Sequence, residues 1–165
     1  MDTLQDAGHL LKTYLNDHRA AATAGLSLAQ RCEGSNVSSP LGAELRALVE
    51  EIEGDAATLE EIASRLSVTD DPVKRVLAQL GEIVGRLKLN GRLRAYSPLS
   101  RLLELEALMA GIDAKRSLWR ALGALHRSDL ADFDFDALER RASAQHTRLV
   151  PFHMDAARVA FGAGW

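Results

Sequence analysis

Apolar residues between positions 41 and 66 recur at spacings of three and four, the period of a helix with one buried face. This stripe consists of Leu41, Leu45, Leu48, Ile52, Leu59, Ile62 and Leu66, and Asp55 fills its one missing position. A carboxylate in a core stripe needs a partner, a ligand or a metal ion, because a buried unpaired charge is costly. Asp55 is therefore a candidate functional residue. It lies toward the edge of its stripe, so an exposed position beside Glu51 is an equal alternative.

A second stripe, near the N-terminus, also has a polar residue at its centre. His18 lies midway along Leu4, Leu11, Leu15, Ala22, Gly25, Ala29 and Cys32. On the last predicted helix, a wheel of about 100° per residue puts His146 and His153 on the apolar face. Two more histidines are therefore expected to face the core.

The segment after Pro98 is apolar nearly all round except for two glutamates. Glu104 and Glu106 are two residues apart, so they point to opposite sides of a helix. The apolar positions of this segment favour Glu106 as the inward-facing one, since they form the stripe Leu99, Leu102, Leu103, Met109 and Ala110.

Capping residues and prolines mark the helix boundaries. Three dipeptides place a capping side chain before a proline at the first helical position: Ser39-Pro40, Asp71-Pro72 and Ser97-Pro98. The last helix is expected to begin at Asp134 or Asp136 and to bend at Pro151. The pattern predicts no strands and five helices, over residues 4–32, 41–66, 72–88, 98–125 and 134–161.

The lengths of these helices predict the topology. Four of them are long and matched, and short loops join the first to the second and the fourth to the fifth as antiparallel hairpins. Residues 67–97 then form a crossover between the hairpins. We expect one all-α domain over residues 1–165, a four-helix bundle with a helical crossover connection.

Composition narrows the class of protein. The chain is 47% hydrophobic and 26% charged, and no apolar run approaches the ~18 residues of a membrane span. Its acidic start does not have the pattern of a secretory signal, so we expect a cytoplasmic protein. The single cysteine, Cys32, excludes an intrachain disulfide and a multi-thiolate zinc site.

Charge is unevenly distributed along the chain. Residues 33–71 hold ten acidic and two basic groups, whereas residues 72–101 hold seven basic groups and one acidic group, Glu82. Pairing of the basic segment 74–101 with the acidic helix, or with a protein partner, is favoured over nucleic-acid binding. A homodimer is a further expectation.

Four polar residues lie within a turn or two of the midpoints of their own helices, where an antiparallel bundle could bring them to one level: His18, Asp55, Glu106 and His146. With its two hairpins and long crossover, the chain resembles the ferritin-like superfamily. That resemblance implies a dinuclear metal site at mid-height, with one glutamate from each of two helices and a Glu-x-x-His pair from each of the other two.

The sequence departs from the ferritin-like pattern at most of these positions. Residue 18 is a histidine where a glutamate is expected, Asp55 has no histidine three residues later, and Ser143 precedes His146 at the glutamate position. Three segments also resemble a group of uncharacterised bacterial proteins, a likeness that implies no activity: residues 14–18, 85–93 and 97–102.

Two functional hypotheses follow. No nucleophile motif or phosphate-binding loop is present, so the first is a non-enzymatic binding or structural module without a cofactor, in which His18 pairs with Asp55 or Glu106. The alternative is a metal-binding oxidoreductase or storage protein that holds iron, manganese or zinc on His18, Asp55, Glu106 and His146.

Overall fold

The computed structural model of the chain describes residues 2–68 and 97–162. Within these ranges the protein consists of helices and has no strand, which confirms the predicted all-α class. The four long helices are α1 (Asp2–Ser35), α2 (Pro40–Arg65), α4 (Pro98–Gly123) and α5 (Phe135–Phe161), with a short 3-10 helix η1 (Ser128–Leu130) before α5. The helix predicted over 72–88, with its cap at Asp71, lies outside the described residues.

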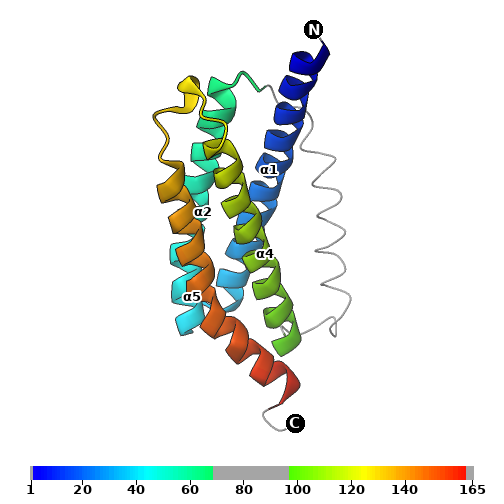
Figure 1. Cartoon of the computed structure of the whole chain (residues 1–165). Helices are drawn as coiled ribbons and strands as arrows, with labels where there is room; N and C mark the ends of the chain where they lie inside the picture. Colours follow the sequence, from blue (N-terminus) through cyan, green and yellow to red (C-terminus); the bar gives the residue numbers. More distant parts are fainter. Residues whose placement is uncertain (1, 69–96, 163–165) are drawn as a thin grey trace.

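The four long helices form a bundle of two antiparallel hairpins (Figure 1). Helix α1 packs on α2 and α4, and α5 packs on α4 and α2, so α2 and α4 face each other across the diagonal. Helix α2 ends and α4 begins at opposite ends of the bundle (Figure 1). Most of the predicted crossover over 67–97 lies outside the described residues.

Each predicted cap between these helices is present. The Ser39 side chain accepts a hydrogen bond from the Gly42 backbone N–H at 3.1 Å, and Ser97 accepts one from the Ser100 N–H at 3.1 Å. Asp134, one of the two predicted starts of the last helix, caps the backbone N–H of Ala137 at 2.8 Å. These bonds satisfy N–H groups that have no partner within the helix.

Helix α5 continues through Pro151 and changes direction in its second half (Figure 1). A proline inside a helix cannot donate to the carbonyl four residues earlier, here that of Thr147, and its ring crowds that turn. The bend expected from the sequence is therefore present.

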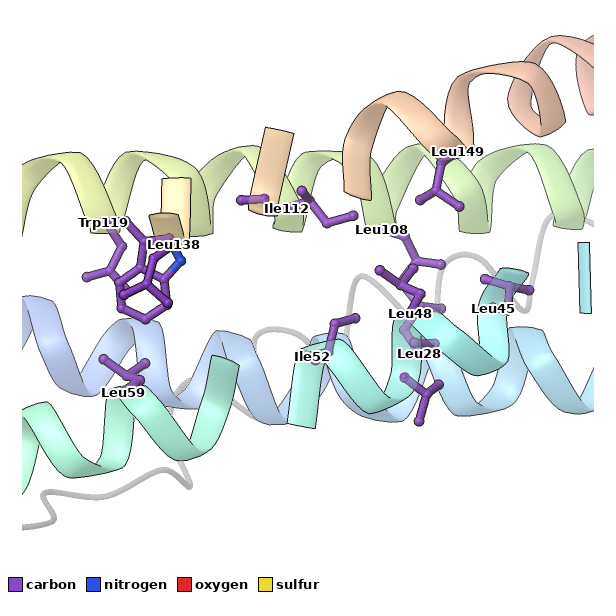
Figure 2. Packing of buried hydrophobic residues seen from close by; sticks show 14 of the residues in the cluster. Leu28, Leu45, Leu48, Ile52, Leu59, Leu108, Ile112, Trp119, Leu138 and Leu149 are labelled. Carbon is purple, nitrogen blue, oxygen red and sulfur yellow. The ribbon is translucent and has the colours of Figure 1, made fainter. Parts of the chain in front are cut away.

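Leucines from all four helices fill the centre of the bundle together with Trp119 (Figure 2). The largest fully buried apolar side chains are Trp119, Leu15, Leu45, Leu48, Ile62, Leu105, Leu118, Leu122 and Leu149. Burying one such side chain contributes roughly 1.5–3 kcal/mol, so this core is the main source of stability. No described helix combines enough length with enough apolar character to cross a membrane.

The prediction that Glu106 faces the core is wrong. Glu106 is exposed, whereas Glu104 is buried at 7% exposure. Leu105 and Leu108 lie in the core, while Leu99 is 37% exposed and Ala110 is also exposed. The buried face of α4 is therefore rotated from the predicted stripe, which turns Glu106 outward.

Candidate functional site

Asp55 lies in the core with only 3% of its surface exposed, so the alternative of an exposed side chain is wrong. Its carboxylate oxygens accept from three side chains. Oδ2 accepts from Lys115 Nζ at 2.5 Å and from Gln145 Nε2 at 3.2 Å, and Oδ1 accepts from Arg141. The lysine also donates to Gln145 Oε1 at 2.6 Å, which closes a polar cluster of these four residues. Asp55 is thus fully paired within the fold.

Sequence reasoning missed Lys115 and Gln145, although a signal for both was present. On α4 the buried residues Leu108, Ile112, Trp119 and Leu122 leave one gap in a three-and-four spacing, and Lys115 fills it. On α5, Gln145 stands in the same way among Leu138, Ala142 and Leu149. The rule that found Asp55 would have found its partners.

Lys115 is largely buried. Burial lowers the pKa of Lys115, and the Asp55 carboxylate offsets only part of that effect. The Lys115 side chain is 16% exposed, while Arg141 is 42% exposed and extends toward solvent. The cluster contains one carboxylate, that of Asp55, and two cations, Lys115 and Arg141, so its formal charge is +1.

Long side chains also bridge α2 and α5 beyond the cluster. Arg148 donates to Glu44 at 2.6 Å and to Glu51 at 2.9 Å. Direct packing between these two helices is limited, so the arginines and Gln145 span the interface. These bonds fix the register of α5 against α2.

A cleft of about 90 Å³ lies between α1, α2 and α4, next to the cluster. Its apolar lining includes Ile52, Leu59, Leu108, Ile112, Leu118 and Trp119, and its polar residues are His18, Asp55 and Lys115. Alanines and glycines form the rest of the wall, among them Ala22, Gly25 and Gly111. We call this site the α1–α4 cleft. Small residues on the facing helices leave the space that larger side chains would fill.

Trp119, which lines the α1–α4 cleft, has a donor without a partner among the described residues. The residue is 1% exposed, and its indole nitrogen Nε1 is buried with no hydrogen-bond partner among the described residues. A buried tryptophan N–H normally has a partner, and leaving it unpaired costs about 1–3 kcal/mol.

His18 lies at the α1–α4 cleft without pairing to Asp55. Its ring packs edge-on against Tyr14, with 4.6 Å between the ring centroids. Burial lowers the pKa of His18, and Asp17 raises it only in part. The ring is therefore neutral near pH 7. The predicted bonds of His18 to Asp55 or Glu106 are absent from the described part of the chain.

The other predicted site residues lie elsewhere. His146 is within 3.5 Å of Asp113, and His153 is within 3.2 Å of Glu106. Their side chains are 28% and 26% exposed, so both histidines lie at the edge of the α4–α5 interface and not in the core. The predicted layer of four residues does not converge, because the buried face of α4 is rotated and the inward face of α5 carries Gln145.

The residues present do not fit a metal ion. Within residues 2–68 and 97–162, no three His, Cys, Asp or Glu side chains are grouped so that they could hold one. The oxygens of Asp55 face Lys115 and Arg141, which would repel a bound cation.

The buried Glu104 pairs with residues of α1. Arg31 lies 2.9 Å from one carboxylate oxygen, and Cys32 donates to the other at 3.3 Å. Burial, together with the adjacent Glu104, raises the pKa of the Cys32 thiol. A thiol held protonated is a poor nucleophile, so this cluster joins α1 to α4 and does not form a reactive centre.

Fold and site together define a four-helix bundle with a small cleft beside a buried polar cluster. Comparison of the chain with protein-family models, curated proteins and solved structures gave no match in any of the three. The ferritin-like resemblance, the homodimer and the cytoplasmic location stay predictions. So does a protein partner for segment 74–101, most of which lies outside the described residues.

Proposed function

We propose that this protein is a non-enzymatic binding module that takes a small, mostly apolar molecule with a hydrogen-bond acceptor into the α1–α4 cleft. One observation carries the proposal. The buried N–H of Trp119 has no partner among the described residues, and its residue lines the cleft. A ligand acceptor would satisfy this donor and recover the free energy that its isolation costs.

The volume of the cleft limits the ligand. An apolar cavity of about 150 Å³ holds one benzene molecule. A cleft of about 90 Å³ therefore suits a ligand of roughly four or five non-hydrogen atoms. Such a ligand would bind with a dissociation constant on the order of 1 mM, because few atoms contribute contact energy.

The polar cluster supports this role by holding the helices in place. Asp55, Lys115 and Gln145 satisfy one another and join α2, α4 and α5 beside the cleft. A binding site needs such fixed walls, since reorganisation on binding would cost affinity. The metal-binding alternative has less support, because the Asp55 oxygens already face two cations.

The proposal is tested by measuring propionamide binding with ligand-observed NMR. The test variant is Gly25→Leu, which adds a side chain at the wall of the cleft, where a Cβ meets no atom within 4 Å. The matched control is Gly54→Leu, at an exposed position of α2 outside the cleft. We expect the wild type and Gly54→Leu to bind and Gly25→Leu to lose binding. No binding to the wild type, or equal binding to all three, would contradict the proposal.

A further inference from the structure

We propose that the ligand of the α1–α4 cleft is a short-chain monocarboxylate, held by Lys115 and the indole N–H of Trp119. This inference rests on the proposed function and narrows it to one chemical class. It has three supports: the donors at the cleft, their placement on α4, and the charge of the polar cluster.

The cleft offers donors that an acceptor-only group can satisfy. Lys115 has three N–H donors, of which Asp55 and Gln145 accept two, and Lys115 itself lines the cleft. Trp119 supplies a second N–H that is buried and has no partner in the described ranges. A carboxylate accepts at both oxygens and donates nothing, so it matches this pair.

Lys115 and Trp119 also lie on the same face of α4. They stand four residues apart, a spacing that puts Cβ atoms about 5–6 Å from each other, and both residues line the cleft. In the proposed complex, each oxygen of the carboxylate accepts from one of these two residues. The apolar tail would then lie against Ile52, Leu108 and Ile112.

The charges around the cleft favour an anion. Asp55 is the one acidic residue among the described residues of the lining. Its Oδ1 is bound to Arg141, and its Oδ2 is bound to Lys115 and Gln145. This carboxylate balances one of the two cations and leaves one positive charge. Helix α1 contributes His18 to the described lining, and this histidine is neutral.

The other described acidic groups near the cleft pair with basic residues or are exposed to solvent. Glu51 of α2 pairs with Arg148 at 2.9 Å. On α4, Asp113 pairs with Arg116 at 3.2 Å and lies near His146 of α5. On α1, Asp17 is exposed to solvent. Among the described residues that line the cleft, a bound carboxylate would therefore meet no unpaired acidic side chain.

The experiment compares three probes of similar size by titration of the wild-type protein: propionate, propionamide and propylammonium. We expect propionate to bind about tenfold more tightly than propionamide, because charge-assisted hydrogen bonds are about twice as strong as neutral ones. Propylammonium, a cation without an acceptor, should not bind. Equal affinities for propionate and propionamide would overturn the inference. Failure of all three probes to bind would contradict the proposed function itself.

Two variants test whether Lys115 is the source of the preference for propionate over propionamide. Lys115→Met should abolish the preference for propionate while propionamide still binds. Arg116→Met removes a neighbouring cation that does not line the cleft, so this matched control should keep the preference. A preference for propionate that survives in folded Lys115→Met would also overturn the inference. If that variant does not fold, the order of the three wild-type affinities decides.

Discussion

Lys115 of α4 donates to Asp55 of α2 at 2.5 Å, sixty residues apart in sequence and across the diagonal of the bundle. Asp55 is 3% exposed, and the lysine side chain is 16% exposed. The pair thus lies largely out of water, where removing one partner leaves the other charge uncompensated.

Replacing Asp55 by asparagine should therefore be strongly destabilising. We expect Asp55→Asn to lower the free energy of unfolding by about 3 kcal/mol, because Lys115 and Arg141 lose their shared counter-charge. Urea denaturation followed by circular dichroism measures this free energy of unfolding. The matched control is Asp155→Asn, which breaks the exposed Arg158–Asp155 pair and should cost less than ~1 kcal/mol.

The double variant Asp55→Leu with Lys115→Met sharpens this test. Removing both charges leaves no buried ion behind, so this protein should be more stable than Asp55→Asn. Arg141, at 42% exposure, can turn to solvent when its partner is lost. If Asp55→Asn lowers the free energy of unfolding no more than Asp155→Asn does, the cluster does not stabilise the fold.

Replacement of two α2 glycines by alanine should change the free energy of unfolding in opposite directions. A Cβ at Gly42 would lie 2.7 Å from the carbonyl carbon of Asn36, whose oxygen accepts two bonds from Ser39. Gly42→Ala should lower the free energy of unfolding by at least ~2 kcal/mol. Gly54→Ala, with nothing within 4 Å, should raise it by about 0.5–1 kcal/mol. Thermal unfolding of both variants compares them, and a stable Gly42→Ala would contradict the tight α1–α2 turn.

Stability should fall at acid pH in part because of His18. Burial lowers the pKa of His18 in the folded state, so the unfolded chain binds this proton more tightly. The free energy of unfolding then decreases as the pH falls below about 6.5, the pKa of an exposed histidine. Between about pH 7 and pH 5, the wild type should lose more stability than His18→Gln. Identical pH dependence of the two proteins would contradict this assignment.

Much of the fold could be predicted from local chemistry. Ser39, Ser97 and Asp134 cap their helices because each bond depends only on residues within three positions. The spacing of apolar neighbours marks Asp55, Lys115 and Gln145 as interruptions of their buried stripes. It does not show that these three residues bond to one another, because the sequence does not state which helices face each other across the bundle.

The rotation of α4 explains why the prediction that Glu106 faces the core is wrong. That helix is apolar nearly all round, so small differences in packing decide which glutamate is buried. Glu104 is inside because Arg31 and Cys32 of α1 bond to it, and Glu106 is outside with His153. Such pairings depend on tertiary contacts, which periodicity within one helix does not encode.

The most direct test of the binding proposal is the indole N–H signal of Trp119 in a ¹⁵N–¹H correlation spectrum. The chain has two tryptophans, so a Trp165→Phe variant assigns the signal. With saturating propionate, the Trp119 N–H proton should move downfield as it gains a charge-assisted hydrogen bond. A Trp119 signal that stays in place while propionate binds would contradict the account.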